Sequence, residues 1–122
     1  MARILLLEEE PNIAGIVLFK LRREGHDVRW EERLDQAAAE AAAREHRPDL
    51  VIADLDGGHE AVAAALSPQW PVLGLTDGTD PLAEGRARAA GAIEAVPKPF
   101  KPTVLANVVA RLGPALGSGN AR

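Results

Sequence analysis

Cysteine is absent from the sequence. Its absence excludes disulfide frameworks, thiolate nucleophiles and zinc sites built on thiolates. A chain without cysteine is typical of proteins that work in a reducing compartment, and we therefore expect a cytoplasmic protein.

Long apolar runs and basic stripes are also missing. Only four large apolar residues follow Arg3 before three glutamates begin, which is too short for a membrane span or a secretion signal. The net charge is −4 and only three residues are lysine, so no basic stripe is available for a phosphate backbone. The sequence contains no glycine-rich phosphate loop of the Walker or dinucleotide type. We expect this chain to bind neither membranes nor nucleic acids.

Apolar residues are abundant and are arranged in short runs. They make up 47% of a 122-residue chain, which is enough for one compact domain. Five short apolar runs predict strands, and helical patterns follow each of them. The predicted strands cover residues 3–7, 26–31, 50–53, 72–75 and 93–96, and the predicted helices cover residues 11–24, 35–46, 60–66, 80–91 and 103–112.

Alternation of strands and helices favours a single fold class. Consecutive parallel strands need helical crossovers, which cover both faces of the sheet. We therefore predict an α/β fold with one doubly wound, five-stranded parallel sheet. The domain is expected to span residues 1–113, and residues 114–122 are expected to form a flexible C-terminal tail.

Polar residues stand at the predicted strand ends. Ligands of such sheets bind beyond the carboxyl ends of the strands, where side chains from separate parts of the chain meet. The polar residues at these ends are Glu8, Glu9, Asp54, Thr76 and Lys98. The carboxylates suit a hard divalent cation, and the hydroxyl and ammonium groups suit phosphoryl oxygens. Taken alone, the glutamates are typical of a solvated helix start, so the prediction depends on the joint placement.

Five segments in the same order resemble the receiver domains of two-component response regulators, over roughly residues 3–112. These segments are LLLEEEP at 5–11, PDLVIAD at 48–54, PVLGLT at 71–76, AGA at 90–92 and KPF at 98–100. The resemblance implies a flavodoxin-like strand order, 2-1-3-4-5. It also implies a phosphoprotein of phosphorelay signal transduction, with Asp54 taking a phosphoryl group from a kinase phosphohistidine. Lys98 and Thr76 would then contact the phosphoryl oxygens, and a cis peptide bond is expected between Lys98 and Pro99.

A magnesium site is part of the same resemblance. Glu9 and Asp54 would bind Mg²⁺ directly, Glu8 would act through water, and the backbone carbonyl of Asp56 would complete the protein ligands. The family usually has Asp at the position of Glu9. Because Mg²⁺ requires near-ideal octahedral geometry, we expect weakened Mg²⁺ binding and better tolerance of larger ions such as Mn²⁺ or Ca²⁺.

Other positions depart from the family pattern. Asp77 replaces a small residue after the conserved hydroxyl, where its carboxylate repels phosphate. Ala95 replaces the aromatic switch residue, so signalling by ring rotation is not available. The loop at 56–59 replaces the usual proline and glycine turn after the phosphoacceptor.

The resemblance also implies partners. A sensor histidine kinase or phosphotransfer protein would supply the phosphoryl group, and a downstream protein would dock on the fourth helix, fifth strand and fifth helix. A homodimer is compatible with the family. We expect no turnover of a separate substrate, because the chain at most phosphorylates and dephosphorylates itself. The alternative is a degenerate receiver that acts as a phosphorylation-independent interaction module, motivated by Glu9, Asp77 and Ala95.

Overall fold

A central parallel sheet organises the protein in the computed structural model, which describes residues 1–56 and 58–119. The strand order is β2-β1-β3-β4-β5, as predicted. The strands are β1 (Arg3–Leu7), β2 (Asp27–Glu31), β3 (Leu50–Asp54), β4 (Val72–Asp77) and β5 (Glu94–Lys98). The helices are α1 (Pro11–Arg23), α2 (Gln36–His46), α3 (Glu60–Leu66), α4 (Ala83–Ala89) and α5 (Pro102–Gly119). Among the described residues, none of these helices is both long and apolar enough to cross a membrane.

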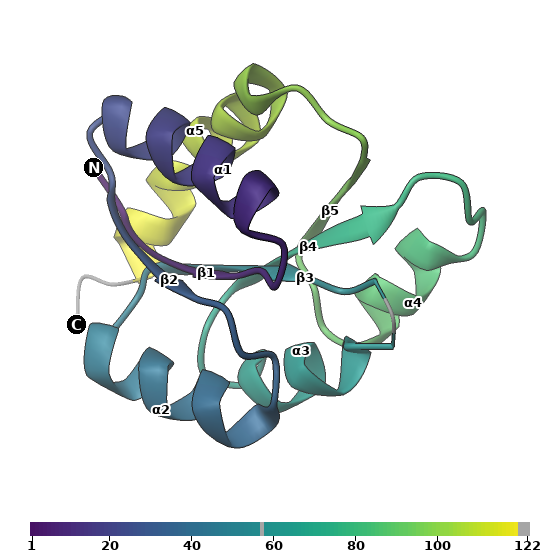
Figure 1. Ribbon diagram of the computed structural model, residues 1–122. Coiled ribbons are helices and arrows are strands. Elements are labelled where there is room, and N and C mark those ends of the chain that lie inside the picture. Colours follow the sequence, from purple (N-terminus) through teal and green to yellow (C-terminus); the bar gives the residue numbers. More distant parts are fainter. Residues whose placement is uncertain (57, 120–122) are drawn as a thin grey trace.

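Helices cover both faces of the sheet. Figure 1 shows α1 and α5 on one face and α2, α3 and α4 on the other. Strand residues alternate between the two cores: Leu6 and Ile52 pack on the α1 and α5 side, whereas Leu5 and Val51 pack on the other side. The segments 4–7 of β1 and 50–53 of β3 are therefore apolar without a break, as expected for central strands buried on both faces.

Local signals in the sequence set the helix starts. Helix α1 begins at Pro11, and the Glu10 side chain accepts a hydrogen bond from the backbone N–H of Asn12. Helix α2 begins after Asp35, whose carboxylate accepts from the N–H of Ala38 at 2.8 Å. The chain leaves α1 through Gly25 at φ +92°, a conformation that favours glycine.

The last helix is longer than the sequence predicted. We expected it to end near residue 112 and a tail to follow, but the α5 backbone is helical through Gly119. Extending an existing helix adds one hydrogen bond per residue without a new nucleation cost. The tail predicted at 114–122 is therefore helical through 119, and residues 120–122 lie outside the described residues.

Strand register brings the carboxyl ends together at one edge. Leu7 pairs with Ala53, Asp54 pairs with Leu75, and Asp77 pairs with Lys98. The last residues of β1, β3, β4 and β5, and the residues that directly follow these strands, therefore meet at this edge. The site was predicted at the same edge from the sequence.

Candidate functional site

Lys98 lies at the centre of an acidic cluster at the carboxyl edge of the sheet. Its ammonium nitrogen Nζ is 2.9 Å from Oδ1 of Asp54, 3.4 Å from Oδ2 of Asp56 and 3.5 Å from Oε1 of Glu8. We call these four residues the Lys98 cluster. The peptide bond between Lys98 and Pro99 is cis, as expected. The backbone N–H of Gly78 donates to the Lys98 carbonyl at 3.1 Å, where a Cβ on residue 78 would lie 2.1 Å from that oxygen.

Glu8 is the most deeply buried carboxylate of the cluster, with no exposed surface. Its Oε2 accepts from the backbone N–H of Glu10 at 3.1 Å, whereas Oε1 is buried and has no hydrogen-bond partner within residues 1–56 and 58–119. The indole N–H of Trp30 donates to the Glu8 carbonyl at 2.7 Å and fixes the backbone. Burial, and to a smaller extent the neighbouring Asp54, raises the pKa of Glu8 from 4.5 to about 7, although the hydrogen bond from the Glu10 N–H and the charge of Lys98 act to lower it.

Asp54 ends β3 and is 6% exposed, so it is largely shielded from solvent. Its Oδ1 accepts from the backbone N–H of Asp56 at 3.0 Å and also contacts the Lys98 ammonium. Burial raises the pKa of Asp56, although the Lys98 charge opposes this effect. Burial would lower the pKa of Lys98, but its hydrogen bond to Asp54 and the surrounding carboxylates raise it above its ordinary value. The ammonium therefore stays charged and holds the carboxylates together.

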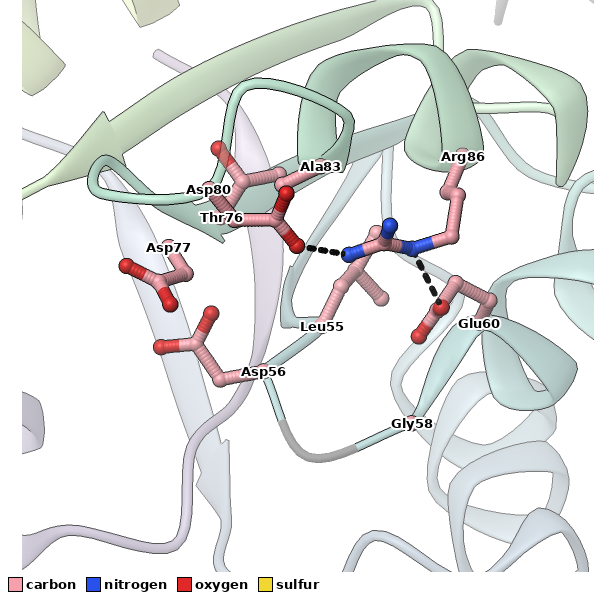
Figure 2. Close-up of a pocket in the computed structure, with 9 residues that line it drawn as sticks. All are labelled: Leu55, Asp56, Gly58, Glu60, Thr76, Asp77, Asp80, Ala83 and Arg86. Atoms are coloured by element: carbon pink, nitrogen blue, oxygen red, sulfur yellow. Dashed lines mark hydrogen bonds and ion pairs between the residues drawn. The ribbon is translucent and has the colours of Figure 1, made fainter.

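Thr76 lines a pocket beside the Lys98 cluster and is 4% exposed. Figure 2 shows this pocket, which has a volume of about 140 Å³. We call it the Asp77 pocket, and its polar lining consists of Asp56, Glu60, Thr76, Asp77, Asp80 and Arg86. Asp56 belongs to both the cluster and the pocket, so the two are adjacent.

Arg86 closes one side of the pocket. Its guanidinium pairs with Asp80 in the loop before α4 and with Oε1 of Glu60 on α3 at 3.3 Å, as the dashed lines in Figure 2 show. These two partners hold Arg86 against the β4–α4 loop.

Glu9 lies apart from the Lys98 cluster. Its side chain is 60% exposed, and Oε1 lies 3.2 Å from Nε2 of His59. The structure therefore brings together Glu8, Asp54, Asp56 and Lys98 and places Thr76 in the adjoining pocket, but it does not place Glu9 among them. A direct role for Glu9 in metal binding stays a prediction.

Hard oxygen donors make the Lys98 cluster chemically suited to a divalent cation. Three carboxylates converge, and the buried Oε1 of Glu8 has no hydrogen-bond partner among the described residues. In the described ranges, however, no three or more His, Asp or Glu side chains are gathered closely enough to hold a metal ion. The Lys98 ammonium lies among these oxygens, so a cation would compete with it for the same ligands.

Two residues that contact the site were not predicted from the sequence. The indole N–H of Trp30 donates to the Glu8 carbonyl, a contact that the sequence pattern does not predict. Arg86 was not singled out, because both of its acidic partners lie outside its own helix. The only signal in the sequence was that Arg86, in a short helix near the carboxyl edge, has no acidic partner within that helix.

An acidic cluster around one lysine, at the carboxyl edge of a sheet with order 2-1-3-4-5, defines a receiver-type α/β domain. No protein-family model matches the chain. The DNA-binding response regulator MtrA of Mycolicibacterium smegmatis is 36% identical over 116 residues, which cover 90% of this chain and 50% of that protein. The transcriptional regulatory protein PdtaR of Mycobacterium tuberculosis is 36% identical over 103 residues, which cover 80% of this chain and 50% of that protein. The chain thus spans about half the length of both relatives.

Solved structures agree with the sequence comparison. The chemotaxis protein CheY4 of Vibrio cholerae matches with a TM-score of 0.79 and 28% identity, over 91% of this chain and 98% of that chain. The chain belongs to the receiver domains of two-component response regulators. Receiver domains of this family generally bind Mg²⁺, and they interact with histidine kinases and downstream targets. The alternative of a phosphorylation-independent interaction module is not favoured by these similarities.

Proposed function

We propose that Asp54 is the phosphoacceptor of this receiver and takes its phosphoryl group from a phosphohistidine on a sensor histidine kinase or phosphotransfer protein. The observation that carries the proposal is the 2.9 Å contact between Lys98 Nζ and Asp54 Oδ1 in a largely buried site. A buried carboxylate held by a charged lysine is positioned for in-line attack, and positioning is the main contribution that proteins make to phosphoryl transfer. We place the reaction in the cytoplasm, where such kinases use ATP.

The proposed transfer is a substitution at phosphorus. An Asp54 carboxylate oxygen forms the new P–O bond as the P–N bond to the donor imidazole breaks, and the imidazole keeps the bonding electron pair. Lys98 stays charged and can contact a phosphoryl oxygen, and the Thr76 hydroxyl lines the adjoining pocket and can donate to another.

The carboxylates of the cluster supply oxygen donors of the kind that Mg²⁺ prefers, and Glu8, Asp54 and Asp56 would hold it once the Lys98 ammonium had moved aside and the carboxylates had drawn closer together. Glu9 would join through movement of its exposed side chain. When bound, the cation would neutralise negative charge on the phosphoryl group and the carboxylates. The loss of a compact Asp ligand at Glu9 supports weaker binding of Mg²⁺ than of the larger Mn²⁺.

We further propose that α4, β5 and α5 form the face that carries the output. Arg88 on α4 and Arg111 on α5 both pair with Glu94 on β5, at 2.9 and 3.0 Å, and this network joins the three elements. Since Ala95 has no ring that could rotate, a change at Thr76 would reach this face through the backbone of β4 and β5. The partner would be a downstream protein or a second copy of the chain.

Intact-mass measurement tests the phosphoacceptor assignment. The chain is incubated with MgCl₂ and phosphoramidate, and the expected product carries one phosphoryl group that hydroxylamine removes, as it does from acyl phosphates. Asp54→Asn should give no adduct. Asp49→Asn is the matched control, because Asp49 directly precedes β3 at the end opposite to Asp54, and among the described residues its side chain accepts only from the Arg3 N–H, at 2.8 Å.

Two results would contradict the proposal. One is the absence of any adduct in the unchanged chain with Mg²⁺ or Mn²⁺. The other is an adduct that persists in Asp54→Asn and resists hydroxylamine, which would place the modification on another residue.

A further inference from the structure

Negative charge dominates the Asp77 pocket. Four carboxylates, from Asp56, Glu60, Asp77 and Asp80, face one guanidinium from Arg86, which leaves a net of three negative charges when all are ionised. Arg86 is already paired with two of these carboxylates. Lys98 contacts Asp56 but also Asp54 and Glu8, so its charge is shared among three carboxylates.

Asp77 is the exposed carboxylate of this lining, and its geometry is fixed. Its Oδ1 accepts from the backbone N–H of Thr79 at 2.8 Å and from the Thr79 hydroxyl at 2.6 Å. These hydrogen bonds lower the pKa of Asp77, so the side chain carries its charge throughout the neutral range. Figure 2 shows the carboxylates of Asp77 and Asp56, which both line the pocket, next to each other.

Thr76 indicates what the pocket receives. Its side chain is 4% exposed and lines the pocket together with the carboxylates. A threonine hydroxyl can donate one hydrogen bond, so it is suited to a polar group that enters the pocket. In the proposed function this group is the phosphoryl group, so a phosphodonor must approach past Asp77.

We propose that Asp77, with the acidic lining of its pocket, makes the site discriminate against small dianionic phosphodonors. This inference rests on the proposed function of Asp54. Like charges slow the approach of an anion, and the effect grows with the charge of the donor and is screened by salt. A donor with compensated charge, such as a phosphohistidine presented by a protein, is affected less. Asp77 thus determines specificity through charge, while Asp54 performs the attack.

Two small donors separate charge from reactivity. Acetyl phosphate is a dianion at neutral pH, and phosphoramidate is a monoanion. With acetyl phosphate, the Asp54 oxygen bonds to phosphorus as the P–O bond to acetate breaks and acetate leaves with the electron pair. With phosphoramidate, the P–N bond breaks and the protonated nitrogen leaves with the electron pair as ammonia. Both reactions give the same phosphorylated Asp54.

The experiment measures the second-order rate constant of phosphorylation by intact mass, with each donor and saturating MgCl₂. Asp77→Asn removes the charge and keeps an oxygen that can accept from Thr79. We expect the variant to react about fivefold faster with acetyl phosphate and less than twofold faster with phosphoramidate. Raising the salt from about 0.05 M to about 0.5 M should accelerate the unchanged chain with acetyl phosphate and affect the variant less.

Glu45→Gln is the control, since it makes the same change in net charge on the 73% exposed side chain of Glu45 in α2. Its rate constants should equal those of the unchanged chain. Equal acceleration with both donors, or rates independent of Asp77 and of salt, would overturn the inference and leave Asp54 as the phosphoacceptor. If neither donor modifies any of the three proteins, the proposed function fails and the inference fails with it.

Discussion

The ammonium nitrogen of Lys98 lies 2.9 Å from Oδ1 of Asp54, and this ion pair joins the end of β5 to the end of β3. Asp54 and the other two carboxylates of the Lys98 cluster depend on the same cation. The stability of the domain and the chemistry of the site are therefore linked through one side chain.

Removing the Lys98 charge should destabilise the fold. Lys98→Met leaves three partly or fully buried carboxylates without a counter-charge, and we expect the free energy of unfolding at pH 8 to fall by about 3 kcal/mol. Urea unfolding in metal-free buffer measures this change. Lys101→Met is the control, because Lys101 is exposed and makes no ion pair with any described residue. Equal stability of the two variants would contradict the assigned role of Lys98.

The buried carboxyl of Glu8 should make stability depend on pH. Its pKa is about 7 in the folded chain and 4.5 as an ordinary value, so the folded state binds more protons between these two values. Stability attributable to Glu8 is thus complete below pH 4.5 and is lost as the pH rises toward 7, by about 3 kcal/mol in total.

Glu8→Gln should remove this dependence. The free energy of unfolding of the variant, minus that of the unchanged chain, should increase by about 3 kcal/mol when the pH is raised from 4 to 8. Chemical denaturation at both pH values gives the difference, and Glu24→Gln, at the exposed end of α1, is the control. A constant difference between Glu8→Gln and the unchanged chain would show that Glu8 titrates normally.

Shortening Glu9 should strengthen Mg²⁺ binding. Glu9→Asp restores the compact ligand that octahedral Mg²⁺ favours, and we expect about tenfold tighter binding, measured by the shift of Tm on titration with MgCl₂. Glu10→Asp shortens the neighbouring side chain equally and keeps a residue that caps helices well, so its affinity should not change. Weaker binding in Glu9→Asp would show that the longer side chain is needed.

The indole of Trp30 should support the position of Glu8. Trp30→Phe removes the donor to the Glu8 carbonyl and should cost about 1 kcal/mol of stability. The same change should weaken Mg²⁺ binding, because the Glu8 backbone is less constrained. Trp70→Phe serves for comparison, since the indole of Trp70 makes no hydrogen bond within the described ranges. If both variants bind Mg²⁺ equally, the Trp30 hydrogen bond is structural only.

Most of the fold could be predicted because its signals are local. Apolar runs define β1 and β3, Asp35 caps α2, and Gly25 follows α1. The carboxyl-edge rule for parallel sheets then placed Glu8, Asp54 and Lys98 together. The end of α5 was predicted too early, because Gly113 and Pro114 are poor helix residues but an established helix can extend through them.

Side-chain direction and distant pairing could not be predicted from spacing. Glu8 and Glu9 are adjacent and chemically alike, yet one is fully buried and the other is 60% exposed, because only Glu8 continues the buried side of β1. Arg86 on α4 forms an ion pair with Glu60 on α3, and this contact depends on the packing of the two helices. The loop conformation that brings His59 to Glu9 is equally non-local.

Gly78 links the backbone that follows β4 to the end of β5. Its N–H donates to the Lys98 carbonyl, and a side chain at this position would collide with that oxygen. The backbone that follows Thr76 is thereby fastened to the backbone of Lys98. The spacing between Thr76 and Lys98 is consequently set by the backbone of β4 and β5, next to the strand that ends in Asp54.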